Sequence, residues 1–290
     1  MAKNIQLIII DPQNSFCQVV DPAEQQRIHD GELCVTGAWD DMVRVANLIN
    51  RIGDKIDDIS VTLDSHDRLH IAHPLWFRSV SSNRMPDPFT IMREENGKIF
   101  GSTFGGVELG EFRTVRQGFM EQTIKYLKAL KAGNRYPHVI WPFHCLIGTP
   151  GHNIVAPLAE ALFDWENVNI ARFQKITKGS NPSVEHFSAV RAEVVDPNDP
   201  STSLNTNLIR SLMEADVILL AGEARSHCLA NTVRDIADEF KADQDAFIRK
   251  CVLLSDATSD VPGCEALGET FVKEMVARGM QISTTKDYLA

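Results

Sequence analysis

Short apolar runs alternate along this chain with longer segments in which apolar residues recur at helical spacing. The runs predict β-strands at Ile5–Ile10, Ile59–Leu63, Val139–Trp141, Val168–Phe173, Val217–Ala221, Cys251–Leu254 and Met280–Ser283. The segments of helical period predict helices near Ala38–Ile52, Phe119–Lys131, Cys228–Lys241 and Glu265–Arg278. A run such as 217–221, apolar at every position, is typical of a strand that is buried on both faces of a sheet.

Alternating strands and helices predict a three-layer α/β/α sandwich around a mainly parallel sheet with right-handed crossovers. Two segments break the alternation. Residues 77–117 contain a Gly-rich piece at 101–106 and no clear period, which predicts a long ordered loop of the lid or binding type. Residues 191–207 are rich in turn formers and predict a surface excursion. We therefore expect one domain over residues 1–290, with an inserted loop and helix region around 77–135.

Five chemically capable residues each follow a different predicted strand. They are Asp11, Asp64, His144, Lys178 and Cys228. In an open parallel sheet, ligands bind in the crevice outside the carboxyl ends of the strands. Residues far apart in the sequence would therefore meet in one small volume, which predicts an enzyme.

Composition narrows the choice of partner and compartment. The chain has 290 residues and a formal net charge of −10, which argues against nucleic acid and anionic membrane surfaces as partners. No apolar run approaches the roughly 20 residues that span a bilayer. The six cysteines form no C-x-x-C pair, so we expect reduced thiols, a reducing compartment and a cytoplasmic location.

The candidate nucleophile is Cys228, between a buried strand and a predicted helix. The positive end of a helix dipole would lower the pKa of its thiol, and unpaired N–H groups there would stabilise an oxyanion. Lys178 could hold a nearby thiolate by charge, although most lysines are simply solvated. Asp11 could take the thiol proton and deliver it to a leaving amine.

Carboxylate and imidazole groups supply a candidate metal site. Asp64 and His66 lie two residues apart at a strand end, and the distant His144 would close the site. These are ligands that zinc prefers, with iron or manganese as alternatives. The spacing does not decide whether His70 or His73 also faces the ion.

Taken together, these residues resemble the isochorismatase-like cysteine hydrolases, and within them the nicotinamidase/pyrazinamidase branch. Each motif is modest alone, but their order along most of the chain is specific. The matching segments are Leu7–Cys17, Gly31–Ala38, Asp64–His70, Trp141–Gly151, Lys178–Gly179 with Phe187–Ala189, Gly222–Asp235 and Ser255–Thr258.

The resemblance implies amide hydrolysis, with nicotinamide giving nicotinate and ammonia in NAD salvage. It implies a catalytic triad of Asp11, Lys178 and Cys228. It implies a divalent metal, zinc first, on Asp64, His66 and His144, with His70 as a possible fourth ligand. A cis peptide at Ala224–Arg225 would help form the oxyanion hole. The substrate ring would be flanked by Phe16, with Trp76 and Trp141 as further candidates.

Two departures from the family pattern leave the substrate open. Glu223, Arg225 and Ser226 are atypical, and the segment between His70 and His144 is longer than usual in the family. The alternative is a metal-free relative that acts on another amide, a ureido compound or isochorismate. A non-catalytic binding module is disfavoured because all triad residues are present. A dinucleotide-dependent oxidoreductase is disfavoured because neither G-x-G-x-x-G nor a phosphate-binding loop follows a strand. Family members often form homo-oligomers, so assembly of this chain is an expectation.

Overall fold

The computed structural model describes residues 3–21, 26–240 and 245–290, which are built around a six-stranded sheet. Its strands, in spatial order, are β10 (Gln174–Lys178), β4 (Asp58–Asp64), β1 (Ile5–Ile10), β11 (Val217–Gly222), β12 (Cys251–Leu254) and β13 (Gln281–Ser283). Every neighbouring pair is parallel. The central strands β1, β11 and β12 are buried almost throughout, as their apolar runs predicted.

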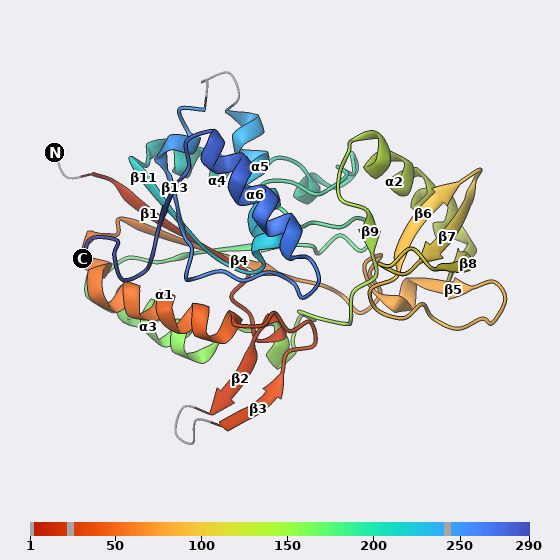
Figure 1. Cartoon of the computed structure of the whole chain (residues 1–290), viewed down its shortest axis with the longest axis horizontal. Helices are drawn as coiled ribbons and strands as arrows, with labels where there is room; N and C mark the ends of the chain where they lie inside the picture. Colours follow the sequence, from red (N-terminus) through yellow and green to blue (C-terminus); the bar gives the residue numbers. More distant parts are fainter. Residues whose placement is uncertain (1–2, 22–25, 241–244) are drawn as a thin grey trace.

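Helices cover both faces of this sheet (Figure 1). On one face α1 (Ala38–Ile52) packs against α3 (Ala156–Asn169). The other face carries α4 (Thr206–Glu214), α5 (Ala230–Glu239) and α6 (Glu265–Ala277). The predicted three-layer α/β/α fold is confirmed. A small antiparallel pair, β2 (Gln18–Asp21) and β3 (Gln26–Asp30), projects below α1 in this view.

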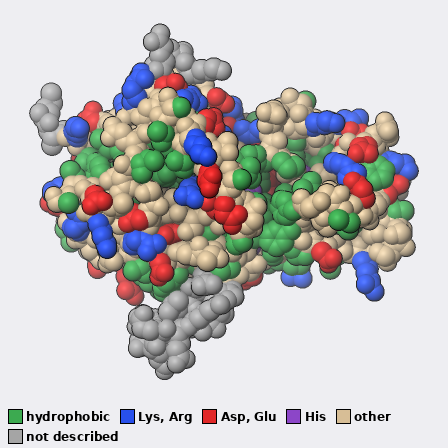
Figure 2. All heavy atoms as spheres, viewed as in Figure 1, with side chains coloured by type: hydrophobic (Ala, Val, Ile, Leu, Met, Phe, Trp, Pro, Cys, Tyr) green, Lys and Arg blue, Asp and Glu red, His purple; other side chains and the backbone are tan. Residues whose placement is uncertain are grey.

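Residues 77–139 build a second, antiparallel sheet beside the main body (Figure 1). Its spatial order is β5 (Phe77–Ser79), β8 (Glu108–Thr114), β7 (Lys98–Ser102), β6 (Ile91–Glu95) and β9 (His138–Val139). Helix α2 (Met120–Ala132) packs on it and shares a separate apolar core with the sheet. On the face viewed in Figure 2, hydrophobic side chains gather where this insertion meets the main body.

The prediction of an irregular loop over 77–117 was wrong, because this segment holds β5 to β8. These strands are short, and residues such as Glu94, Glu95, Glu108 and Glu111 give them little apolar pattern. Their pairing comes from backbone hydrogen bonds between neighbours and from one apolar face, which a window of sequence does not reveal. The predicted helix near 119–131 is confirmed as α2.

Two predicted strands were misplaced. Residues 168–169 end helix α3, and Val168 and Ile170 are 75% and 89% exposed, so the apolar run at 168–173 is not a strand. The strand follows at β10, a mostly exposed edge strand. The run at Val139–Trp141 contributes only β9, which belongs to the second sheet.

The remaining helices differ in detail from the pattern. Helices α3 and α4 were not predicted, and α5 begins at Ala230 rather than at the nucleophile candidate. The predicted end of that helix, Lys241, lies outside the described residues. Among the helices of the described ranges, none combines the length and the apolar character that crossing a membrane would require.

Candidate active site

Four neighbouring parallel strands bring the candidate residues to one edge of the main sheet. Asp11 follows β1, Asp64 ends β4 and Lys178 ends β10. Cys228 lies beyond β11, in a π-helical turn over Arg225–Leu229 that leads into α5. Because Lys178 and Asp64 are paired across β10 and β4, their side chains leave the sheet at the same level.

Lys178 stands at the centre of this group. Its Nζ lies 2.8 Å from Asp11 Oδ2, 3.2 Å from Asp64 Oδ1 and 3.6 Å from Cys228 Sγ. It also donates to the carbonyl oxygen of His186 at 3.1 Å. The side chains of Lys178, its two carboxylate partners and Cys228 are all buried. One ammonium group therefore holds two carboxylates and a thiol within direct contact, away from bulk water.

The shared charge explains the pKa directions at the site. Burial would lower the pKa of Lys178, but Asp11 and Asp64 outweigh it and hold that pKa well above its usual value. Burial also opposes ionisation of Asp64, yet His66 and Lys178 keep its pKa well below the usual range. Burial raises the pKa of Asp11, because Lys178 and the hydrogen bond from Thr62 offset that shift only in part and the nearby Asp64 adds to it. A raised pKa makes Asp11 the better proton acceptor of the two carboxylates.

The predicted lowering of the Cys228 thiol pKa was wrong. Burial raises its pKa well above the usual value, Lys178 opposes that shift, and the nearby Asp11 adds to it. The cysteine lies within the π-helical turn Arg225–Leu229, which runs directly into α5 at Ala230. A thiol with a raised pKa keeps its proton at neutral pH, so a base would have to remove that proton before Cys228 could act as a nucleophile.

Asp11 is held in place by a reciprocal contact with β4. Thr62 Oγ1 accepts the Asp11 backbone N–H at 3.0 Å and donates to Asp11 Oδ1 at 2.5 Å. The backbone of Asp11 has a φ of 43°, in the left-handed region that Asp and Asn tolerate better than most residues. The second oxygen, Oδ2, is left to face Lys178.

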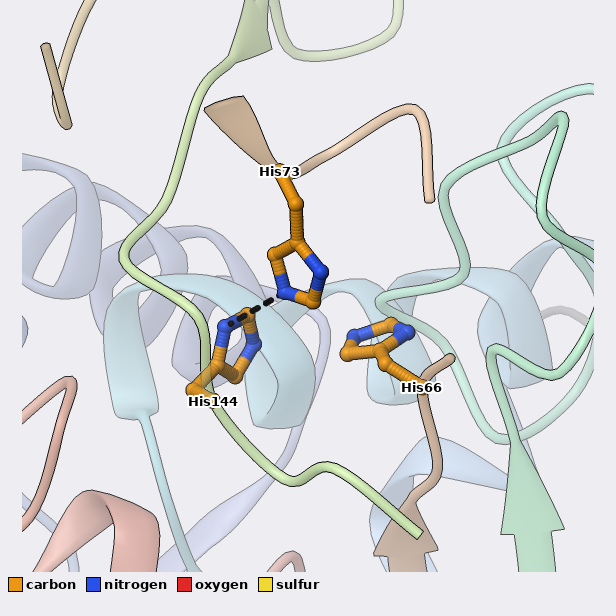
Figure 3. A group of neighbouring side chains, drawn as sticks. All are labelled: His66, His73 and His144. Carbon is orange, nitrogen blue, oxygen red and sulfur yellow. Dashed lines mark hydrogen bonds between the residues drawn. The ribbon is translucent and has the colours of Figure 1, made fainter. Parts of the chain in front are cut away.

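Three histidines lie together beside the lysine and can hold a metal ion. One ring nitrogen from each of His66, His73 and His144 lies within 4.8 Å of the other two, and Figure 3 shows these rings turned toward a common centre. The closest contact joins His73 Nε2 and His144 Nδ1 at 3.3 Å. Asp64 Oδ2 lies 2.9 Å from His66 Nε2 and 3.2 Å from His144 Nε2, so this carboxylate borders the same centre.

The histidine group contains His73 where His70 was named as the possible fourth ligand. His70 Nδ1 accepts the Ala72 N–H at 3.1 Å, and its ring lies beside that of His66 with centroids 4.3 Å apart. Among the described residues, neither His70 Nε2 nor His73 Nδ1 has a hydrogen-bond partner, so only the meeting of its ring with those of His66 and His144 distinguishes His73. Burial and the neighbouring histidines lower the pKa of His73 to about 2, so its ring is neutral. Imidazole nitrogens beside a carboxylate are the donor set that a borderline divalent cation such as zinc prefers.

Two glycines at this edge allow a close approach that no other residue permits. Gly179 follows the lysine with a φ of +81°, and a Cβ there would lie 2.7 Å from His66 Cε1. Gly222 ends β11 with a φ of +107°, and a Cβ would lie 2.1 Å from the Ile10 carbonyl oxygen. Both positions belong to the sequence segments quoted above, although no pattern predicted these contacts.

The cis peptide bond lies one residue before the predicted position. It joins Glu223 and Ala224, not Ala224 and Arg225. The Arg225 N–H donates to the Ser259 carbonyl at 2.8 Å, so it is already used and does not fit an oxyanion hole. The Arg225 side chain forms an ion pair with Asp260. A role for Ala224 in the oxyanion hole stays a prediction.

The aromatic candidates divide between two places. Phe16 lies against His144 with ring centroids 5.6 Å apart, and Trp141 lies edge-on to His227 at 5.3 Å. Trp76 was wrongly placed at the substrate ring. Its indole stacks on Phe119 at 4.4 Å and donates to Thr123, inside the core of the insertion.

Sequence reasoning missed two aromatic residues next to the site. Phe187 and His227 lie 5.5 Å apart, and Phe187 packs edge-on to Trp141 at 6.3 Å. His227 directly precedes the candidate nucleophile, and Phe187 follows the residue whose carbonyl binds Lys178. These positions in the sequence, next to the candidate nucleophile and next to the residue that binds the lysine, could have indicated that both aromatic residues lie at the site.

Comparison with known proteins rests on structure alone. Neither protein-family models nor curated protein sequences match this chain. Among solved structures, the yeast nicotinamidase Pnc1p bound to the inhibitor nicotinaldehyde is similar, with a TM-score of 0.58 and 16% identity, over 97% of this chain and 99% of that chain. The two chains share one fold.

Two further structures extend the likeness across distant organisms. A nicotinamidase/pyrazinamidase of Acinetobacter baumanii has a TM-score of 0.58 and 19% identity, over 99% of this chain and 98% of that chain. The pyrazinamidase of Pyrococcus horikoshii, in complex with zinc, has a TM-score of 0.52 and 18% identity, over 97% and 99% of the two chains. Identities this low establish the shared fold, and the chemistry must be argued from the residues of the site.

Proposed function

We propose that this chain is a metal-assisted cysteine amidohydrolase that converts a small aromatic carboxamide, nicotinamide, to nicotinate and ammonia. The observation that carries the proposal is the contact of one buried lysine with both an acid and a thiol. Lys178 Nζ lies 2.8 Å from Asp11 and 3.6 Å from Cys228. An adjacent base is what a cysteine with a raised pKa needs in order to act as a nucleophile.

The residues can divide the reaction into two steps. In the first, Cys228 Sγ attacks the carboxamide carbon while Asp11 accepts the thiol proton, and Asp11 then delivers this proton to the departing nitrogen. Ammonia leaves and a thioester remains. In the second step, Asp11 accepts a proton from water as the oxygen attacks the thioester carbon. The proton returns to the sulfur, so nicotinate leaves and the free thiol is restored.

Lys178 supports both steps by charge. Its ammonium group stabilises the carboxylate of Asp11 before proton transfer and the thiolate of Cys228 when the C–S bond forms or breaks. Its raised pKa keeps it protonated throughout the neutral range. We therefore assign it an electrostatic role and leave proton transfer to Asp11.

His66, His73 and His144, with Asp64 beside them, would hold a divalent metal, for which we propose zinc. When bound, such a metal supplies a Lewis acid that orients the ring nitrogen of the substrate. Phe16 supplies a flat apolar surface beside His144, and Trp141 supplies one beside His227, next to Cys228; such surfaces suit an aromatic ring. Five of the cysteines are buried thiols, which supports our proposal of a reducing, cytoplasmic location.

The test is ammonia release from a panel of nicotinamide, pyrazinamide, benzamide and a ureido compound, with metal content measured by elemental analysis. We expect hydrolysis of the heteroaromatic amides by protein that holds about one transition metal ion per chain. Cys228→Ala should abolish ammonia release, whereas Cys264→Ala, at a comparably buried thiol, should retain it. Full activity in Cys228→Ala would contradict the proposal. Metal-independent turnover of the ureido compound alone would favour the metal-free relative.

A further inference from the structure

The inserted region returns to the main body directly beside the nucleophile turn. Between α2 and β9, Tyr136 extends its hydroxyl to the backbone of that turn. Tyr136 Oη donates to the Ser226 carbonyl oxygen at 3.2 Å, across 90 residues of sequence. Ser226 is the second residue of the π-helical turn that carries Cys228.

Arg234 determines where the tyrosine proton points. Its Nη1 donates to Tyr136 Oη at 2.8 Å, from helix α5. A guanidinium group has donors and no acceptor, so the tyrosine must use its lone pair for Arg234. Its single proton is then available to the Ser226 carbonyl. The two hydrogen bonds form one directed chain from α5 through the insertion to the nucleophile turn.

The tyrosine ring supports the same turn by packing. It lies edge-on to His227, with centroids 5.5 Å apart and an interplanar angle of 81°. His227 directly precedes Cys228 and is itself fixed by a 2.9 Å contact of its Nδ1 with Ser226 Oγ. Tyr136 therefore contacts both residues that lead into the nucleophile, one through its hydroxyl and one through its ring.

The neighbouring Arg135 holds the backbone next to Tyr136 in place through ion pairs. Its guanidinium group lies 2.7 and 2.9 Å from the carboxylate of Glu193, and 2.7 Å from Asp235 on helix α5. Both carboxylates are buried. Since separating a buried ion pair leaves uncompensated charge, the backbone at Tyr136 has little freedom relative to α5.

We propose that Tyr136 is a positioning residue for the nucleophile. Its hydroxyl, oriented by Arg234, fixes the Ser226 carbonyl and so keeps the sulfur of Cys228 within reach of Lys178 and Asp11. The long segment between His70 and His144 thus contributes a part of the active site. The effect on hydrolysis rests on the proposed function, whereas the effect on the thiol does not.

Tyr136→Phe removes the hydroxyl and keeps the ring against His227. We expect kcat to fall about three- to tenfold, as for the loss of one hydrogen bond, with KM changed less than about twofold. Alkylation of Cys228 by iodoacetamide, followed by mass spectrometry of the Cys228 peptide, should slow by a similar factor. Metal content should not change.

The matched control is Tyr126→Phe. Tyr126 is a buried tyrosine of the same insertion, and its hydroxyl lies 3.4 Å from His138 and accepts the Glu185 N–H. That variant should lose stability but keep kcat and the alkylation rate. Arg234→Met should slow alkylation in the same direction as Tyr136→Phe, because the tyrosine proton loses its orientation.

Wild-type kcat and wild-type alkylation in Tyr136→Phe would overturn the proposal. An equal loss in Tyr126→Phe would do so as well, because it would indicate general loosening of the insertion. If Tyr136→Phe fails to fold, an unchanged alkylation rate in folded Arg234→Met overturns it. If the wild-type protein hydrolyses no amide, the proposed function fails, and the alkylation rates still decide the positioning role.

Discussion

The central lysine offers the sharpest test of the site. Lys178→Met keeps most of the side-chain length and removes the charge that Asp11, Asp64 and Cys228 share. Lys178 is 2% exposed and Asp11 is 0% exposed, so water does not replace the lost partner. Breaking a buried ion pair from one side costs about 3–5 kcal/mol. We expect a loss of that size in the free energy of unfolding at pH 7.5.

The loss should depend on pH in a direction that the pKa shifts define. The folded-state pKa of Asp64 is depressed, so in the wild type its contribution is complete above its unfolded pKa of about 4 and is lost only as pH falls below that value. The folded-state pKa of Lys178 is raised, so its contribution persists through the neutral range and is lost only in strong alkali. Removing Lys178 should raise the pKa values of the buried carboxylates in the folded variant, so at pH 5 they take up protons that wild-type Asp64 does not bind. The difference between variant and wild type should therefore narrow from pH 7.5 to pH 5.

Urea unfolding followed by tryptophan fluorescence at both pH values measures this difference. Lys175→Met is the matched control, because Lys175 lies on the same strand β10 with an exposed side chain over the Phe173 ring. It should change stability little at either pH. A Lys178→Met loss below about 1 kcal/mol at pH 7.5, or one that does not change with pH, would refute the charge-sharing argument.

Two further predictions concern the metal site. His73→Ala should lower the metal affinity about 10- to 100-fold, whereas His70→Ala should retain it, because of these two histidines only His73 belongs to the group that meets at one point. Elemental analysis of both purified proteins measures the metal content. Equal metal content in the two variants would exclude His73 as a ligand. Gly179→Ala should destabilise the fold by about 1–3 kcal/mol, because the backbone has φ +81° and the new Cβ would press on His66. Urea unfolding measures that loss, and wild-type stability together with full metal content would show that the backbone relaxes freely there.

The amino-acid sequence by itself determined the centre of the fold. Strands β1, β11 and β12 are covered on both faces, so they had to be apolar at nearly every position, and their bounds were predicted closely. The bounds of helix α1 were also predicted from the sequence, because one face of this helix is apolar and the other is polar. Chemically capable residues just past these strands then indicated a site, since the carboxyl ends of parallel strands share one edge.

Only the tertiary structure decided what depends on partners distant in the chain. Strand β10 lies at a sheet edge with exposed side chains, so its pattern carried no apolar run. The sequence spacing did not show whether His70 or His73 joins the histidine group. In the folded chain the ring of His73 faces His144. The raised pKa of Cys228 follows from burial, which a local motif does not contain. Tyr136 reaches the nucleophile turn only because the inserted region packs against the main body, and no periodicity reports such a contact.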